Sequence, residues 1–84
     1  MDAYFTYMVL CSDNTLYTGY TDNLKRRMEA HNSGKGAKYT RAHLPVQLVY
    51  TECFETKGDA MRREIEIKSL TREQKLTLIE SAAK

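Results

Sequence analysis

Two β-strand patterns joined by a short turn occupy the first twenty residues of this 84-residue chain. Residues 4–11 (YFTYMVLC) are rich in aromatic and β-branched side chains and are apolar at both odd and even positions. That pattern predicts a strand buried on both faces. Residues 15–20 (TLYTGY) give a second strand pattern, and residues 12–14 have the composition of a turn. We therefore expect a β-hairpin whose first strand is covered on both sides.

A helix pattern follows the hairpin directly. Thr21 or Asp22 can act as the N-cap, because both side chains can accept a hydrogen bond from a first-turn amide. Gly34 and Gly36 then supply stop signals after the last turn. The helix is therefore expected to run to about Asn32.

The segment after these glycines contains a third strand pattern. Residues 37–43 can form one short helical turn, which ends before Pro45. Residues 46–54 (VQLVYTECF) have the composition of a strand. A second long helix is expected from near Thr56 to about Ser69.

A capping-box pair, Thr71 and Gln74, predicts a last helix over residues 72–82. The element order is then β-β-α-β-α-α. This order favours an α+β fold in which a small three-stranded antiparallel sheet is flanked by helices. A chain of this length makes one small domain, residues 1–84, with its core over about residues 4–70.

Composition excludes several classes of protein. No apolar run approaches the roughly 20 residues of a membrane span, and the N-terminal sequence MDAYFTYMVLC lacks the basic region of a signal peptide. Cys11 and Cys53 are not spaced as metal ligands, and a secreted disulfide scaffold would carry more cysteines. We therefore expect a reduced, cytoplasmic protein without a membrane partner.

Basic residues are concentrated in one part of the sequence. Residues 25–43 hold six lysines and arginines against a single acid, Glu29. Such asymmetry indicates a polyanion partner, although a lysine-rich solvated loop would look the same. The loop within this segment mixes glycines with cations and one tyrosine, a combination suited to phosphate contacts and base stacking or simply to a mobile surface. Its candidate binding residues are Lys35, Lys38, Tyr39 and Arg41.

Two residues of the first helix lie at the border of its apolar stripe. Leu24 and Met28 define that stripe, and Arg27 and His31, one turn apart, both fall at one edge of it. Arg27 would then pack its stem against the sheet and hold its guanidinium at the edge. An ordinary snorkelling arginine would be placed in the same way.

The second long helix carries an acid within its apolar arc. Glu64 projects between the positions of the apolar residues Ala60, Met61, Ile65 and Ile67. A carboxylate there costs free energy unless a cation or hydrogen bonds compensate it. Lys68, four residues on, offers a surface ion pair worth only a few tenths of a kcal/mol. A divalent cation or a group across a cleft would explain the placement better.

The hairpin supplies two tyrosines and a glycine to the same region. Tyr7 and Tyr17 lie on strands joined by a tight turn, so they can be neighbours, and strand tyrosines are most often packing residues. Gly19, at the end of its strand, would let a backbone or ligand approach closely.

Taken together, Tyr7, the YTG triplet at residues 17–19, Arg27, His31 and Glu64 resemble the GIY-YIG nuclease superfamily. The similarity covers residues 4 to about 70. The segments LYTGYTDNLKRRMEAHNSGKGAKYTR and MRREIEIKSL look especially like its small stand-alone bacterial members, which are mostly uncharacterised. The first motif departs from the pattern, since Phe5 and Thr6 replace its glycine and isoleucine.

The resemblance implies phosphodiester hydrolysis at one divalent cation, Mg²⁺ or Mn²⁺. By position, Glu64 matches the metal-binding glutamate and Arg27 the arginine that steadies the scissile phosphate. Tyr7 and Tyr17 match the tyrosines that orient or deprotonate the attacking water, with Tyr17 preferred as the base. His31 matches a helix histidine that relays a proton or hydrogen-bonds a tyrosine.

The implied partner is DNA, branched or damaged by analogy with the family, and the implied assembly is a monomer or weak homodimer. A second departure is that no asparagine follows Asn32, whereas many family nucleases carry a late asparagine that contacts phosphate. Lys38 or Arg41 can substitute for it. Two alternatives to an endonuclease remain at this stage, a nucleic-acid-binding module without efficient catalysis and an interaction subunit that supplies the domain to a partner.

Overall fold

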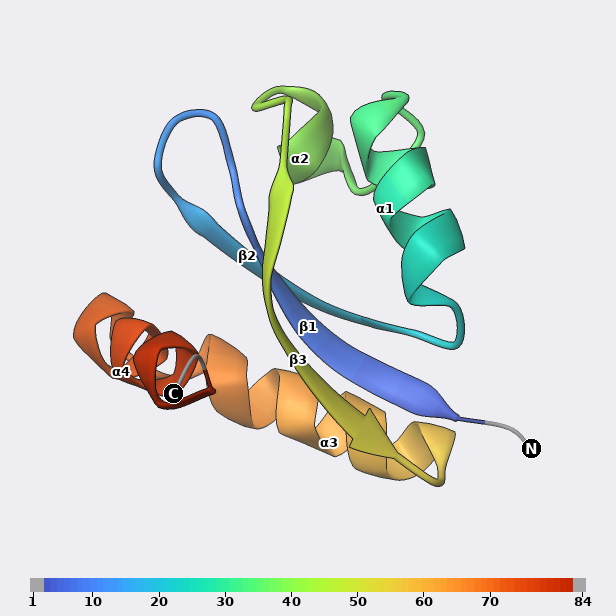
Figure 1. Cartoon of the computed structure of the whole chain (residues 1–84), viewed down its shortest axis with the longest axis vertical. Coiled ribbons are helices and arrows are strands. Elements are labelled where there is room, and N and C mark those ends of the chain that lie inside the picture. The colour runs from blue at the N-terminus through green and yellow to red at the C-terminus, as the bar shows by residue number, and fades with distance from the viewer. Residues whose placement is uncertain (1–2, 83–84) are drawn as a thin grey trace.

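A three-stranded antiparallel sheet forms the centre of the computed structural model, which describes residues 3–82 (Figure 1). Strand β1 (Tyr4–Leu10) lies between β2 (Leu16–Thr21) and β3 (Gln47–Phe54). The predicted hairpin is confirmed, and its turn places Asn14 in the left-handed region at φ 68°. The central position of β1 explains why its sequence is apolar on both faces.

Four helices complete the predicted order. They are α1 (Leu24–Asn32), the one-turn α2 (Lys38–Arg41), α3 (Lys57–Lys68) and α4 (Arg72–Ala82). Figure 1 shows α1 and α2 on one side of the sheet, and α3 with α4 on the other. The fold is therefore the expected α+β arrangement. No helix within residues 3–82 has the length and apolar character that crossing a bilayer requires.

The N-cap of α1 differs from the prediction. Asn23, not Thr21 or Asp22, caps the helix, and its Oδ1 accepts a hydrogen bond from the Arg26 amide at 3.0 Å. Thr21 is still paired with Phe5 in the sheet, so its hydroxyl instead accepts from the Asn23 amide at 3.1 Å. Asp22 and Asn23 therefore connect the end of β2 to the start of α1, and the cap lies one residue later than predicted.

The caps of the later helices agree with the sequence. Thr56 Oγ1 accepts a hydrogen bond from the Asp59 amide at 3.2 Å. The Thr71 amide donates to Gln74 Oε1 at 2.9 Å, and the Gln74 amide donates to Thr71 Oγ1 at 3.2 Å. The capping box predicted for α4 is therefore formed.

Alternate residues of β1 face the two helical layers. On the α1 side, Tyr7 and Val9 are fully buried and pack in one cluster with Cys11 and Val46. On the α3 side, Thr6 is fully buried and its hydroxyl donates to the Ala60 carbonyl at 2.7 Å. The core is therefore two thin layers separated by the sheet.

Helix α3 contacts the sheet through a narrower stripe than the sequence predicts. Ala60 and Ile67 are fully buried, but Met61 and Ile65 are 39% and 67% exposed. Residues seven apart return to the same side of a helix, whereas positions 61 and 65 are rotated by about 100° and about 140° from Ala60. Glu64 lies on the buried line, one turn from each of its apolar members.

Both cysteines are free thiols. Cys11 is buried and Cys53 is exposed on β3.

Candidate active site

The hydroxyl of Tyr7 is the centre of a buried polar cluster. Tyr7 points from β1 towards α1 and is fully buried. Its oxygen lies 2.8 Å from His31 Nε2 and accepts a hydrogen bond from Arg27 Nε at 3.3 Å. Three of the residues selected from the sequence therefore meet at one oxygen atom.

Helix α1 supplies two of these groups because Arg27 and His31 are four residues apart and share a face. His31 is fully buried, which is deeper than the border position predicted for it. Its Nδ1 lies 2.8 Å from Thr40 Oγ1 of α2. Arg27 remains half-buried, as expected for a guanidinium at the edge of the sheet.

Tyr17 lies beside the same cluster without a direct bond to Tyr7. In the hairpin register, Tyr17 pairs with Val9 and Tyr7 pairs with Gly19, so the two tyrosines are diagonal neighbours. The Tyr17 ring meets the His31 ring edge-on, with centroids 5.7 Å apart. Tyr17 is partly exposed, whereas Tyr7 is not.

The position of Gly19 has a different reason from the one predicted. A Cβ added there would lie 2.6 Å from the Tyr7 hydroxyl oxygen and 2.8 Å from the ring carbon that carries it. The space left by the missing side chain is therefore filled by Tyr7. The close approach that Gly19 permits is that of the Tyr7 side chain from the neighbouring strand β1.

We expect Gly19→Ala to lower the free energy of unfolding by about 1–3 kcal/mol, the usual cost of overpacking a filled core. The Tyr7 ring cannot move aside easily, because it is fully buried and its hydroxyl is bonded on two sides. Urea denaturation measures the change. Gly58→Ala is the matched control, since a Cβ there meets nothing within 4 Å. Equal stability of the two variants would contradict this packing of Tyr7.

Burial sets the protonation states in the cluster. It raises the pKa of Tyr7, an effect that the hydrogen bond from Arg27 partly offsets. Burial also lowers the pKa of His31, and the positive charge of Arg27 lowers it further. At neutral pH the phenol is therefore protonated and the imidazole is neutral.

Glu64 lies on α3, which covers the other side of the sheet from α1. Its side chain is only 16% exposed, and its nearest cation is Lys68, at 3.6 Å, with a side chain that is 52% exposed. The Glu64 charge is a minor contributor to the raised pKa of Tyr7. The predicted ion pair with Lys68 thus exists, but it is long for a hydrogen bond and weak compensation for a carboxylate so buried.

The donor set suits Mg²⁺ or Mn²⁺ rather than zinc. No group of three or more His, Cys, Asp or Glu side chains able to hold a metal occurs within residues 3–82. Mg²⁺ in phosphate-processing sites needs only one or two carboxylates, because water and the substrate phosphate complete its shell. Glu64 can provide such a ligand, whereas a closed zinc site would need about four protein ligands.

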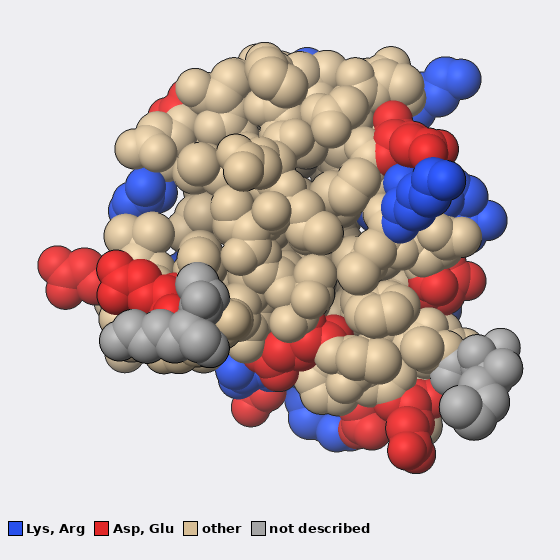
Figure 2. Space-filling model, in the orientation of Figure 1, with Lys and Arg blue, Asp and Glu red and all other residues tan. Residues whose placement is uncertain are grey.

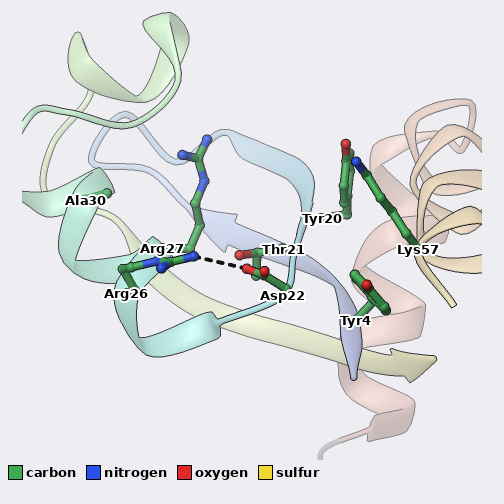
Figure 3. Close-up of a pocket in the computed structure, with 8 residues that line it drawn as sticks. All are labelled: Tyr4, Tyr20, Thr21, Asp22, Arg26, Arg27, Ala30 and Lys57. Carbon is green, nitrogen blue, oxygen red and sulfur yellow. Dashed lines mark hydrogen bonds and ion pairs between the residues drawn. The ribbon is translucent and has the colours of Figure 1, made fainter. Parts of the chain in front are cut away.

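A pocket of about 570 Å³ adjoins the cluster where β2 ends (Figure 3). Arg26, Arg27 and Asp22 lie on one side of it, and Tyr4, Tyr20 and Lys57 on the other. Arg26 is paired with Asp22 at 3.2 Å. The pocket therefore combines cations from two helices with aromatic side chains from two strands, and its volume lies within the range of ligand sites.

The other candidate binding residues lie on and before α2. Lys35, Lys38 and Arg41 are exposed, and none forms an ion pair within the described part of the chain. Tyr39 is 41% exposed, but it stacks on Tyr17 with centroids 6.4 Å apart. Tyr39 thus also supports the position of a second tyrosine of the site.

Charged side chains are scarce on one face of the molecule. Figure 2 shows the centre of the side nearest the viewer as largely uncharged, with most Lys, Arg, Asp and Glu towards its margins. A polyanion would find little attraction at the centre of this face. The cations Arg26, Arg27 and Lys57 line the pocket at the end of β2 instead.

Two contributors to the site escaped the sequence reasoning. Thr40 is fully buried against His31, and a Cβ added to Gly36 would lie 2.8 Å from His31 Cα. Both residues belong to the glycine-rich segment for which the sequence indicates phosphate contacts or a mobile surface. The sequence signal for Thr40 was a threonine nine residues after His31, and this spacing matches neither helical nor strand periodicity.

Known proteins with similar sequences share this fold. Residues 3–77 match the sequence model of the GIY-YIG catalytic domain. The UPF0213 protein SH2523 of Staphylococcus haemolyticus is 56% identical over 80 residues, covering 95% of this chain and 98% of that protein. None of the names of these relatives states an activity or a substrate.

Two solution NMR structures are also similar. The UPF0213 protein BH0048 from Bacillus halodurans is 46% identical with a TM-score of 0.60, covering 93% of this chain and 83% of that one. The protein EF2693 from E. faecalis is 38% identical with a TM-score of 0.62, covering 100% and 94%.

Proposed function

The chain belongs to the GIY-YIG family, and we propose that it is a metal-dependent endonuclease that hydrolyses DNA phosphodiester bonds with low sequence specificity. The observation that carries this proposal is the meeting of Arg27, His31 and Tyr7 at one buried hydroxyl, with the charge of Glu64 close enough to affect it. If α1 only packed against the sheet, it would not need an arginine and a histidine in contact with a buried tyrosine hydroxyl.

Arg27 is proposed to hold the scissile phosphate. Its Nε is used by Tyr7, so the two terminal nitrogens of the planar guanidinium can donate to phosphate oxygens. Arg27 also lines the pocket beside the cluster, where Arg26 and Lys57 can contact neighbouring phosphates of the same strand. Most of these contacts would be to the DNA backbone, which explains the low sequence specificity proposed.

Tyr17 is proposed to contact the attacking water. Tyr7 is fully buried and its hydroxyl already has two partners, whereas Tyr17 is partly exposed beside the same histidine. Tyr7 is then the group that positions Arg27 and His31. A phenol at neutral pH orients water well but removes a proton poorly unless cations lower its pKa.

The proposed cation is Mg²⁺ or Mn²⁺, held by Glu64. When bound, it would supply Lewis-acid stabilisation of the negative charge on the phosphate. The late asparagine of many family nucleases has no counterpart here, since no asparagine follows Asn32. Lys38 and Arg41 are exposed and are proposed as additional phosphate contacts.

Cleavage assays on plasmid, flap and four-way-junction DNA test the proposed function. We expect nicking or cutting in Mg²⁺ or Mn²⁺ that stops when the cation is chelated. Binding should weaken steeply with salt, because lysines and arginines displace counterions from DNA. If the protein binds all three substrates in a salt-dependent manner and cuts none, it is a nucleic-acid-binding module and the nuclease proposal is wrong.

A further inference from the structure

Thr40 of α2 has a hydroxyl whose donor and acceptor roles are fixed by its neighbours. Its Oγ1 lies 2.9 Å from the Ala37 carbonyl oxygen, which can only accept. The single hydroxyl proton is therefore directed to Ala37. The contact of 2.8 Å between Thr40 Oγ1 and His31 Nδ1 must then have the ring nitrogen as its donor.

The same reasoning passes through the imidazole to Tyr7. A neutral imidazole carries one N–H, so a ring that donates from Nδ1 must accept at Nε2. The group that lies 2.8 Å from Nε2 is the Tyr7 hydroxyl, which therefore donates its proton there. The low pKa of His31 agrees with a neutral ring.

Arg27 lies at the far end of this chain. Since the Tyr7 proton is directed to His31, the lone pairs of the Tyr7 oxygen are left for the Arg27 Nε–H at 3.3 Å. All four hydrogen bonds thus run in one direction, from Arg27 through Tyr7, His31 and Thr40 to Ala37. Reversing the tautomer of His31 would make Nε2 a second donor to the Tyr7 oxygen, so that neither present partner of the buried Tyr7 hydroxyl could accept its proton.

We propose that Thr40 is a positioning residue, which selects the Nδ1–H tautomer of His31 and thereby holds the Arg27 guanidinium for the phosphate. The role in phosphate binding rests on the proposed nuclease function, but the hydrogen-bond chain does not. Burial supports the proposal, because Thr40, His31 and Tyr7 are all fully buried and water cannot replace a missing partner. The short helix α2 then acts on α1 through two side chains.

Nitrogen NMR of the histidine side chains tests the tautomer directly, without DNA or metal. We expect the wild-type protein at neutral pH to show His31 with a proton on Nδ1 and an unprotonated Nε2. In Thr40→Val, which removes the hydroxyl while keeping the shape, the Nε2–H form should appear. Thr40→Ser should restore the wild-type tautomer, because it keeps the donor and acceptor.

Cleavage by the same variants tests the consequence for Arg27. Thr40→Val should reduce cleavage on the order of tenfold to a hundredfold, by comparison with the loss of a hydrogen-bond partner that orients a metal-bound histidine, and Thr40→Ser should recover most of it. Thr51→Val, at an exposed position on β3, is the matched control. A wild-type His31 protonated on Nε2 would overturn the proposal, even if Thr40→Val did not fold. So would a Thr40→Val protein that keeps the Nδ1–H form. A nuclease proposal that failed would leave the tautomer result unchanged.

Discussion

Arg27→Ala is expected to reduce cleavage by about 10²–10³-fold, which is the usual loss when one charge-stabilising donor is removed from an active site. The side chain contributes in two ways, since its Nε holds the Tyr7 oxygen and its terminal nitrogens are available to phosphate. Arg27→Lys should recover little of the activity. A lysine keeps the charge, but its single ammonium cannot bond Tyr7 and grip a phosphate with a planar pair of donors.

Single-turnover cleavage under saturating protein measures this effect separately from DNA binding. Arg72→Ala, at an exposed position on α4, removes one positive charge at a residue distant in sequence from Arg27. This variant should cleave as the wild type does. Thermal unfolding should show that Arg27→Ala remains folded. Wild-type cleavage by a folded Arg27→Ala protein would exclude Arg27 from phosphate binding.

Glu64→Gln is expected to remove metal-dependent cleavage, while the protein stays folded. Glutamine keeps the shape of the side chain but loses its charge and one ligand oxygen, so a hard cation is held far less strongly. A cation that binds only the folded state raises the melting temperature. We therefore expect Mn²⁺ to raise the Tm of the wild type and to leave that of Glu64→Gln unchanged.

Glu73→Gln, in the exposed first turn of α4, controls for loss of one negative charge. Both measurements are needed, because the Tm shift reports binding without any contaminating nuclease. Unchanged cleavage by Glu64→Gln would indicate such a contaminant or a wrong metal ligand. If Mn²⁺ raised the Tm of Glu64→Gln as much as it raises that of the wild type, Glu64 would be excluded from the cation site.

Local patterns in the sequence were sufficient for most of the fold. The hairpin, the order of the elements and the caps at Thr56 and Thr71 all depend on residues within a few positions of one another. The predicted N-cap of α1 is wrong because Thr21 fits both a strand pattern and a cap pattern. In the structure Thr21 pairs with Phe5 in the sheet, and Asn23 caps the helix. The extent of the buried face of α3 depends on how the helix sits on the sheet, which periodicity does not specify.

The contact of Tyr7 with Arg27 and His31 also follows from local patterns in the sequence. Four residues apart on a helix, Arg27 and His31 share a face, and the hairpin register brings Tyr7 beside Gly19. Thr40 could not be predicted, because its contact with His31 forms across an irregular loop in which Gly34 takes a positive φ of 83°. The pocket at the end of β2 was missed for a similar reason, since Lys57 and Arg26 come together only in the folded chain.

The full burial of Tyr7 affects how mutational data on this protein are interpreted. The residue belongs both to the cluster with Val9 and to the hydrogen-bond chain, so truncating it would empty part of the core while breaking the chain. Lost activity in such a variant could come from the broken hydrogen-bond chain or from a damaged fold, and the two causes could not be told apart. The separable information lies in Arg27, which is only half-buried at the edge of the sheet, and in Thr40, where valine and serine remove and restore the hydroxyl with little change in packed volume.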